Sequence, residues 1–258
     1  MRFVSYNILT GGLHPDRIDL ILKVLKKLSP DYLAIQEANY FEDGKMELLA
    51  KELSLPHYFL SIGGEKGQFG SYSCAVFSNV PFVKSEALSG FRNAAIHTVI
   101  ETKKKELSIV NAHLIPRNDE LKLKELNTII KRQGKYENKI ILGDFNCLAE
   151  YDNYPEDLIS KLDAQESRKL ALDGKLQFGV PKTLIENKYV DVFYELEKNE
   201  NTVPALLDEN EGNKNDLRLD YCFASKNVFA KIVDSSVIKN RDTKNASDHY
   251  PLVIDLEI

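Results

Sequence analysis

Short apolar segments that end in polar or charged residues are the feature of this sequence that most restricts how it can fold. They lie at 3–6, 33–36, 107–112, 140–143, 217–224 and 251–254, and the polar residues that end, interrupt or precede them are Asn7, Glu37, His113, Asp144, Asn146, Asp220, Asp248 and His249. A carboxylate buried at a strand end is costly unless it is paired or holds a metal ion. We therefore expect several strands to finish at one polar site.

The order of the segments predicts two sheets with helices outside them. Helices are expected over 18–28, 46–53 and 123–130, where apolar residues recur at helical spacing. Strands are expected at 3–6, 32–36, 73–77, 95–100, 107–112, 139–142, 217–224, 228–238 and 251–258, with a further short apolar segment at 189–196 and a polar excursion at 151–175. These strands are more numerous than one parallel sheet with regular crossovers would use, so the pattern favours an α+β fold with two packed sheets.

The size of the chain allows one large domain or two small ones, since it has 258 residues. No repeat or linker divides it, so we expect a single domain over residues 1–258, and we expect a monomer. A content of 43% hydrophobic and 28% charged residues excludes disorder as the dominant state. No segment approaches the ~18 consecutive apolar residues of a membrane span, so we expect none.

The cysteines indicate a reducing compartment. Cys74, Cys147 and Cys222 are too few for a disulfide framework, and an odd number cannot all pair within the chain. Reduced thiols are typical of intracellular proteins, and the first residues lack the apolar segment of a secretory signal. We therefore expect a cytoplasmic protein whose cysteines are core residues rather than nucleophiles.

The charge of the chain argues against non-specific binding to long nucleic acid. There are 34 basic and 39 acidic residues, which gives a net charge of −5. A protein that depends on such binding usually carries a basic stripe, and none is evident. The segment 197–216 is strongly acidic and would repel a long polyanion unless it folds away. A short or small substrate, approached with the help of a cation, is favoured over long duplex DNA.

The residue types at the strand ends indicate which cation this is. Carboxylate and amide oxygens are the ligands that Mg²⁺, Mn²⁺ and Ca²⁺ prefer. Zinc is disfavoured, because the sequence has neither the His-x-x-x-His nor the Cys-x-x-Cys spacing. The strand ends therefore predict a site for a hard divalent metal ion.

Each of these residues alone also has a structural explanation. Asp144 could begin an Asx-type turn after its strand. Asp220 could form an ion pair with Arg218, and Glu37 could cap the segment that follows it. Only the whole ordered set favours a functional site.

Strand geometry suggests how the polar residues pair. Neighbouring side chains on a strand point to opposite faces, so Asp248 and His249 need not touch each other. Asp220 is then the better candidate to hold the His249 ring, and Asp248 is free to face a metal ion. Asp144 and Asn146 are two residues apart and can lie on the same side.

Six blocks, in order, resemble the endonuclease/exonuclease/phosphatase superfamily, the metal-dependent phosphoesterases related to pancreatic-type deoxyribonuclease. The blocks are Ser-Tyr-Asn at 5–7, Ile-Gln-Glu at 35–37, Asn-Ala-His-Leu at 111–114, Leu-Gly-Asp-Phe-Asn at 142–146, Arg-Leu-Asp-Tyr at 218–221 and Ser-Asp-His-Tyr-Pro-Leu at 247–252. The resemblance implies a four-layer α/β/β/α sandwich of two packed mixed β-sheets flanked by helices. It also implies a divalent metal ion, Mg²⁺ or Mn²⁺, in a cleft at the strand ends.

The resemblance also implies roles around the metal ion and the phosphate. Glu37 resembles the principal metal ligand, Asp248 a carboxylate on the metal side, and Asn7 the amide beside metal and phosphate. Arg92 lies roughly where many members have a basic residue that binds substrate.

The remaining residues resemble the groups that carry out the attack. Asp144 resembles the residue that aligns or deprotonates the attacking water, and Asn146 the amide that holds this water or the phosphate. His113 and His249 resemble two histidines that contact the scissile phosphate, with Asp220 as the partner of His249.

The sequence departs from two branches of the superfamily. The apurinic-endonuclease branch usually has a tyrosine at the position of His113, so this branch is disfavoured. Pancreatic-type deoxyribonucleases support the equivalent histidine with a glutamate, but residues 71–73 read Ser-Tyr-Ser, so the sequence assigns His113 no partner. There is also no tryptophan to stack on a base.

The function that these observations favour is a divalent-metal-dependent hydrolase of phosphoester bonds that uses in-line attack by water. A nuclease or nucleotidic phosphodiesterase is the first hypothesis, with a nucleic acid or nucleotide as substrate. An inositol-phosphate or phospholipid-headgroup phosphatase or phosphodiesterase is the alternative. A non-catalytic binding module is disfavoured because all eight strand-end positions keep suitable residues. Whether Asp144 or His249 takes the proton from water is left open.

Overall fold

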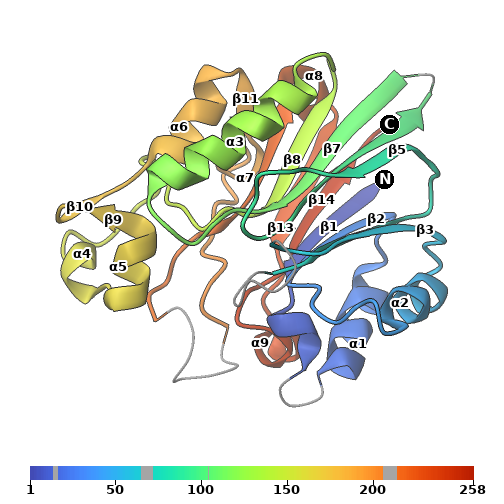
Figure 1. Ribbon diagram of the computed structural model, residues 1–258, viewed down its shortest axis with the longest axis horizontal. Helices are drawn as coiled ribbons and strands as arrows, with labels where there is room; N and C mark the ends of the chain where they lie inside the picture. The colour runs from blue at the N-terminus through green and yellow to red at the C-terminus, as the bar shows by residue number, and fades with distance from the viewer. Residues whose placement is uncertain (14–16, 65–71, 104, 206–213) are drawn as a thin grey trace.

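Two mixed β-sheets packed face to face form the centre of the protein (Figure 1). The computed structural model describes residues 1–13, 17–64, 72–103, 105–205 and 214–258. Within these residues each large sheet has six strands. The first has the order β13-β14-β1-β2-β4-β3, from Ile232–Val237, Leu252–Leu256, Arg2–Asn7, Tyr32–Gln36, Cys74–Ser78 and His57–Ser61. The second has the order β11-β12-β8-β7-β6-β5, from Tyr189–Asp191, Asp220–Ser225, Lys139–Asp144, Lys105–His113, Ala95–Thr102 and Phe82–Ala87.

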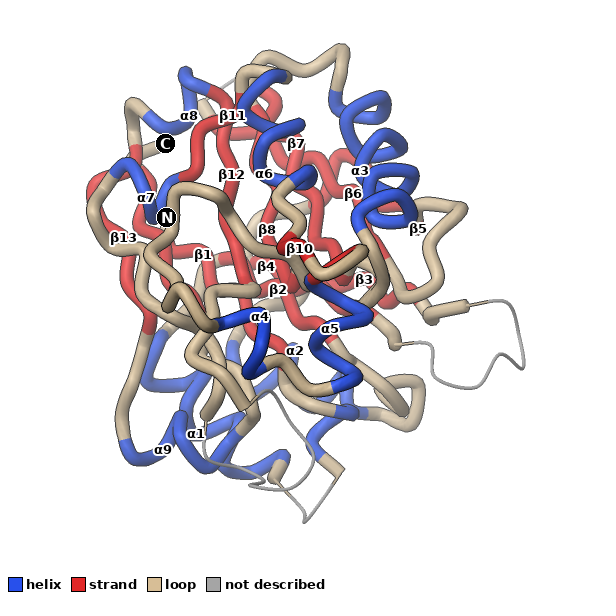
Figure 2. Tube along the Cα trace, turned by 90° about the vertical axis from the view of Figure 1, so that its left-hand side faces the viewer, coloured by secondary structure: helices blue, strands red, loops and turns tan. Residues whose placement is uncertain are grey.

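Helices cover the outer face of each sheet, which confirms the predicted four-layer sandwich (Figure 2). The first sheet packs on α1 (Ile18–Leu28), α2 (Lys45–Leu53) and α9 (Arg241–Ala246), and the second on α3 (Asp119–Gln133) and α6 (Gly179–Glu186). The shorter elements are η1 (Thr10–Gly12), α4 (Leu158–Lys161), α5 (Ala164–Leu170), β9 (Ala171–Leu172), β10 (Lys175–Leu176), α7 (Val192–Glu195) and α8 (Lys226–Phe229). No helix among the described residues is long and apolar enough to cross a membrane.

Three apolar layers hold the sandwich together. The layer between the sheets joins residues such as Phe3, Val76 and Ile109, all almost fully buried. The two other layers lie between each sheet and its helices. Because both faces of the central strands are buried, their sequences are continuously apolar, and this is why they could be predicted.

Some expected elements were wrong in type or extent. The segment 228–238 begins inside α8, and β13 starts only at Ile232. The segment 189–196 is a three-residue strand followed by α7, and 217–224 becomes a regular strand only at Asp220. The strands β3 and β5 were missed because each is the edge strand of its sheet and is only half-buried, so neither carries a clear apolar run.

The topology brings the predicted polar residues to one end of the sandwich. β1 runs parallel to β2, and β7 runs parallel to β8, so the carboxyl ends of these pairs coincide. β14 and β12 are antiparallel to their neighbours and begin at this same end. In the second sheet Asp144 lies opposite His113 on one side and Asp220 on the other.

Close approach of β7 and β8 depends on Gly143. A Cβ atom at this position would lie 2.0 Å from the carbonyl oxygen of Ala112, and the φ of Gly143 is +137°. Any larger residue would therefore push β8 away from β7 and move Asp144 with it.

We expect Gly143→Ala to lower the free energy of unfolding by about 3 kcal/mol or more, because backbone atoms cannot yield to the new methyl group. Gly90→Ala is the matched control, since Gly90 also has a positive φ, of +86°, but has nothing within 4 Å of the added atom. That control should cost only about 1 kcal/mol. Urea unfolding of both variants measures the difference, and equal losses would contradict the close approach.

Candidate active site

Both sheets contribute to the polar cluster at the strand ends. Asn7, Glu37, Asp248 and His249 come from the first sheet and its connections, and His113, Asp144, Asn146 and Asp220 come from the second. All are buried except Asp248, which is half-buried. The cluster therefore lies across the junction between the two sheets.

Asp144 has the largest number of contacts in this cluster. One of its oxygens accepts a hydrogen bond from Nδ2 of Asn7 at 3.1 Å, and the other accepts from the backbone N–H of Asn146 at 2.9 Å. Nε2 of His113 and Nε2 of His249 lie 3.3 and 3.9 Å from the first oxygen. Burial would raise the pKa of Asp144, but the two histidines lower it, so this carboxylate is ionised at neutral pH.

His249 is held by Asp220, as the strand geometry predicted. Nδ1 of His249 lies 2.7 Å from Oδ2 of Asp220, and the hydroxyl of Thr202 donates to the same oxygen at 2.6 Å. Burial would lower the pKa of His249, but Asp220, Asp248 and Asp144 together raise it to about 10. His249 is therefore a cation at neutral pH, and its Nε2–H faces Asp144.

His113 differs from His249 in its charge state. Burial lowers its pKa to about 4, so the ring is neutral at neutral pH. The ring of Tyr72 stacks on it, with 5.5 Å between centroids and 25° between planes. Its buried Nδ1 atom has no hydrogen-bond partner among the described residues. Within the described ranges, His113 is thus supported by a stacked aromatic ring and not by a carboxylate at Nδ1.

Glu37 and Asp248 form a pair of carboxylates whose negative charges act on each other. Glu37 accepts hydrogen bonds from the N–H of Thr10 at 2.7 Å and from Nδ2 of Asn7 at 3.3 Å. Burial and the nearby charge of Asp248 raise the pKa of Glu37 to about 7. A divalent cation would relieve this repulsion, and carboxylate oxygens are the ligands that Mg²⁺ and Mn²⁺ prefer. These residues fit the metal ion that the family implies.

A second group of potential ligands overlaps the cluster. One atom each of Asp144, Asp220 and His249 lie within 4.8 Å of one another. The hydrogen bonds of Asp220 to His249 and Thr202 already occupy one of its oxygens. A protonated His249 has no lone pair to offer a metal ion. Glu37 and Asp248 are therefore better placed to hold the ion.

Asn146 and Arg92 differ in how closely they join the cluster. The side chain of Asn146 donates to the carbonyl of Leu114 at 3.0 Å, and its backbone has a φ of 49°. Arg92 is half-buried, and its charge acts on Tyr72. Asn146 thus lies in the cluster. Arg92 lies at its border, where its charge reaches Tyr72.

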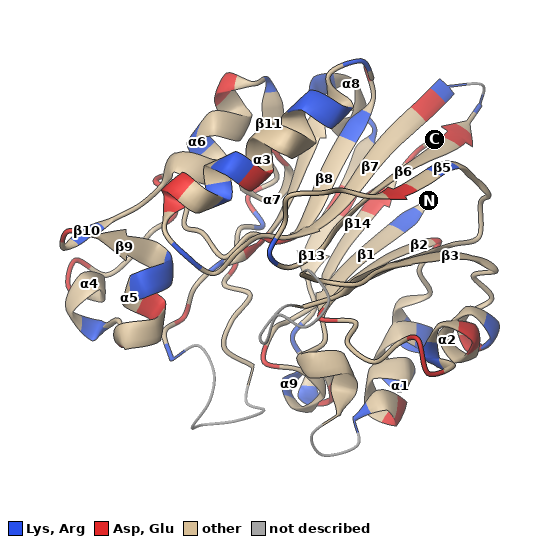
Figure 3. Cartoon of the chain, viewed as in Figure 1, with Lys and Arg blue, Asp and Glu red and all other residues tan. Residues whose placement is uncertain are grey.

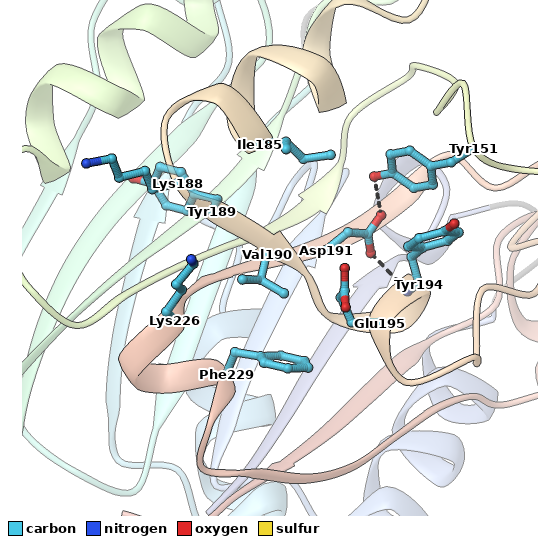
Figure 4. A pocket seen from close by; sticks show the side chains of 10 residues that line it. All are labelled: Tyr151, Ile185, Lys188, Tyr189, Val190, Asp191, Tyr194, Glu195, Lys226 and Phe229. Carbon is cyan, nitrogen blue, oxygen red and sulfur yellow. Dashed lines mark hydrogen bonds between the residues drawn. The ribbon is translucent and has the colours of Figure 1, made fainter.

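A pocket elsewhere in the protein contains none of the predicted site residues. It has a volume of about 570 Å³ and is lined by residues of α6, β11, α7 and α8 (Figure 4). Its carboxylate Asp191 already accepts hydrogen bonds from Tyr151 at 2.8 Å and Tyr194 at 3.3 Å, and forms an ion pair with Arg218 at 2.8 Å. Arg218 also pairs with Asp152 rather than with Asp220. These contacts indicate a structural role.

The sequence as a whole matches one known family. The model of the endonuclease/exonuclease/phosphatase family matches residues 4–249. The chain belongs to this family of phosphoesterases. No curated protein matches it.

Solved structures of the family share its fold at low sequence identity. One is an endonuclease/exonuclease/phosphatase family protein from Leptotrichia buccalis C-1013-b, with 18% identity and a TM-score of 0.69. Others are the 3′ phosphatase NExo from Neisseria, solved with a product DNA hairpin, at 15% and 0.72, and an AP endonuclease from Archaeoglobus fulgidus, at 19% and 0.71. In all three cases the match covers 100% of both chains.

Four residues near the cluster were not found from the sequence. Thr202 lies in the acidic segment 197–216, part of which, 206–213, is outside the described residues. Tyr72 and Lys169 come from segments without a motif, and Lys169 is buried and interacts electrostatically with Asp144 and Asp248. Arg17 donates to the carbonyls of Ile8 and Leu9 at 3.2 and 2.7 Å, which fixes the chain after Asn7. Their positions depend on tertiary contacts that no local pattern reveals.

The protonated His249 predicts how stability changes with pH in the metal-free protein. The folded-state pKa of His249 is about 10, whereas the unfolded value is ~6.5. A raised pKa gives stability that is complete below ~6.5 and is lost as the pH rises toward 10. Between pH 7 and 9 we expect a loss of ~2 kcal/mol from this residue.

Urea unfolding at both pH values, with His249→Gln alongside, measures this contribution. The variant should be less stable at pH 7 and should show a smaller decline up to pH 9. His57→Gln, at the start of edge strand β3, is the control and should decline as the wild type does. Parallel declines in wild type and His249→Gln would contradict the assigned charge.

Proposed function

We propose that this protein is a divalent-metal-dependent phosphodiesterase that acts on nucleic acid or nucleotides by in-line attack of water. The observation that carries the proposal is the placement of His113 and His249, at 3.3 and 3.9 Å, around one carboxylate, Asp144, beside the carboxylate pair Glu37 and Asp248. This arrangement offers one proton acceptor, one cationic donor and a metal site within one cluster.

Glu37 and Asp248 would hold the metal ion, and the side-chain amide of Asn7 donates to Glu37 at 3.3 Å. When bound, a divalent ion polarises a phosphoryl oxygen and stabilises negative charge on the leaving oxygen. The resemblance favours Mg²⁺ or Mn²⁺, and the all-oxygen donor set supports this choice.

Asp144 would accept the proton of the attacking water. It is ionised at neutral pH, and its second oxygen is fixed by the N–H of Asn146. His249 is already protonated, because Asp220 holds its Nδ1–H at 2.7 Å, so it is unsuited to be the base. Its Nε2–H instead can donate to a non-bridging phosphoryl oxygen, where negative charge grows in the transition state.

His113 and Asn146 would position the phosphate. A neutral His113 ring can donate one hydrogen bond to the phosphate. Because it carries no charge, it does not attract a further anion. Asn146 is fixed through Leu114, and Arg92 lies at the border of the cluster, where it can meet a phosphate of the substrate. None of these residues needs to change its protonation during the reaction.

Similar structures and the net charge of the chain indicate the substrate class. Two similar structures are an AP endonuclease and a 3′ phosphatase with DNA, which favours a nucleic-acid substrate. His113 replaces the tyrosine that is usual in the apurinic-endonuclease branch, so we do not assign that activity. The net charge of −5 favours short strands or nucleotides over long duplexes.

Asp144→Asn tests the assignment of the proton acceptor. We expect turnover to fall by ~10²–10⁴-fold, because a neutral amide cannot take the proton, while an acceptor oxygen for Asn146 remains. The assay is Mg²⁺-dependent hydrolysis of single- and double-stranded oligonucleotides, aryl phosphodiesters and monoesters, and inositol phosphates. Asp234→Asn, which removes an exposed charge on β13, is the control.

The pattern of substrates decides between the alternatives. Oligonucleotide cleavage that disappears with chelator and in Asp144→Asn would support the proposal. Turnover restricted to inositol phosphates or monoesters would move the protein to the phosphatase alternative. Near-wild-type turnover in Asp144→Asn would refute the mechanism.

Glu37→Gln tests the metal site independently of activity. We expect the affinity for Mn²⁺, measured by electron paramagnetic resonance or calorimetry, to fall at least ~10-fold, since an anionic ligand becomes neutral. Glu47→Gln, on the exposed face of α2, should bind Mn²⁺ as the wild type does. If Asp220→Asn weakened Mn²⁺ binding more than Glu37→Gln, the ion would lie instead at the group formed by Asp144, Asp220 and His249.

A further inference from the structure

A small lobe is attached beside the catalytic end of the second sheet. We call residues 150–178 the side lobe; it contains α4, α5 and the β9–β10 hairpin, and Figures 1 and 2 show it next to the first turn of α3. Nζ of Lys122 on α3 donates to the carbonyl of Lys169 at 2.7 Å, and the N–H of Asp119 donates to Oε1 of Gln177 at 2.9 Å. The lobe is therefore fixed to the sandwich by buried polar contacts.

A pocket of about 540 Å³ separates the side lobe from the start of α3. Its lining includes two arginines, Arg117 before α3 and Arg168 on α5, and the polar side chains of Asn118 and Ser167. This volume lies within the range of pockets that hold small ligands.

The pocket presents unpaired positive charge. Within the part of the chain that the structure describes, neither Arg117 nor Arg168 forms an ion pair with a carboxylate; Arg117 donates to the carbonyl of Pro116 at 3.0 Å and Arg168 to that of Ala164 at 2.9 Å. Asp173, at the hairpin turn, contributes one negative charge to the lining. Two guanidinium groups against one carboxylate favour an anion, and their planar donors suit a phosphate. Figure 3 shows the band of basic residues on α5.

The pocket also exposes apolar side chains next to these arginines. Leu172 is 50% exposed and Leu121 is 37% exposed, and Ile159 adds to the same lining. A ligand that is polar on all sides, such as an inositol phosphate, would leave these side chains unmatched. A nucleotide has both a phosphate and the apolar faces of a base and sugar, so it matches both parts of the lining.

Helix α5 and the segment after β7 connect the pocket to the catalytic cluster. Lys169 follows Arg168 directly, and neighbouring residues on a helix point ~100° apart. The buried Lys169 interacts electrostatically with Asp144, whereas Arg168 lines the pocket. Arg117 follows His113 by four residues. One helix thus faces the cluster on one side and the pocket on the other.

We propose that this pocket is a subsite for a nucleotide that flanks the scissile phosphodiester. Arg117 and Arg168 bind the phosphate of this nucleotide, and Leu121 and Leu172 contact its base or sugar. The inference rests on the proposed function and narrows it to a substrate with at least one further nucleotide beyond the bond that is cleaved.

The test compares a short single-stranded oligonucleotide with an aryl phosphodiester of thymidine, which has a single phosphate. In the double variant Arg117→Gln, Arg168→Gln we expect the ratio of kcat/KM for the oligonucleotide to that for the single-phosphate ester to fall about 10- to 100-fold. The salt dependence of kcat/KM for the oligonucleotide should also weaken, its logarithmic slope by about 1. Arg132→Gln is the matched control, because Arg132 lies at the other end of α3, and it should leave the ratio unchanged.

A neutral linkage in the substrate locates the contact. A methylphosphonate placed at each linkage next to the scissile one should lower the wild-type kcat/KM at one of these positions. The same linkage should have little further effect on the double variant. Two results would overturn the subsite. One is an unchanged kcat/KM ratio in the double variant, and the other is a methylphosphonate that lowers kcat/KM as much in the double variant as in the wild type.

Binding separates a failure of the subsite from a failure of the proposed function. If the wild type hydrolyses no phosphodiester, the proposed function fails, and the subsite is tested by fluorescence anisotropy of a labelled oligonucleotide on Asp144→Asn. Adding the two arginine substitutions should then weaken binding about tenfold. Equal affinity with and without them, or preferential binding of inositol hexakisphosphate over the oligonucleotide through these arginines, would reject the nucleotide subsite.

Discussion

The contact between the two sheets at their polar end is the constraint on which the candidate site depends. Asn7 at the end of β1 donates to Glu37 in its own sheet and to Asp144 in the other, at 3.3 and 3.1 Å. Deeper in the same junction, Nε2 of Gln36 donates to Oδ1 of Asn111 at 2.7 Å, and Asn111 donates in turn to the carbonyl of Ile35 at 3.0 Å. Apolar packing alone would let two sheets slide, whereas directional bonds between buried groups fix one register.

This register also determines the charges of the site. His249 from the first sheet meets Asp220 and Asp144 from the second, and their charges keep its proton in place. His113 is buried with Tyr72 stacked on its ring, and burial lowers its pKa so that it loses its proton. Two histidines thus acquire different charge states, one cationic and one neutral, because their surroundings at the junction differ. A small shift between the sheets would alter the charge states of both histidines.

The sequence predicted which polar residues lie together better than it predicted the edges of the fold. Polar residues at the ends of apolar strands are costly to bury, so Asp144 and Glu37 were visible without any structure, and the pairing of Asp220 with His249 followed from strand alternation. The half-buried edge strands β3 and β5 were missed because exposed faces weaken the apolar pattern. Thr202 and Tyr72 were missed for another reason: each reaches the cluster only through tertiary contacts, from a segment that reads as a polar loop.

The division between sandwich and side lobe suggests where substrate choice resides. In the proposed function the cluster would recognise one phosphate and a metal ion, a chemistry that nucleic acids, nucleotides and inositol phosphates all share. Discrimination must therefore come from groups outside it. The pocket at the border of the side lobe offers Arg168 and Leu172 from the lobe, and Arg117 and Leu121 from the start of α3. Two cations in a pocket attract one phosphate locally, even on a chain whose net charge is −5, because screening limits the reach of the other charges to ~10 Å. An acidic protein can in this way bind a short nucleic-acid strand without the basic surface that long duplexes require.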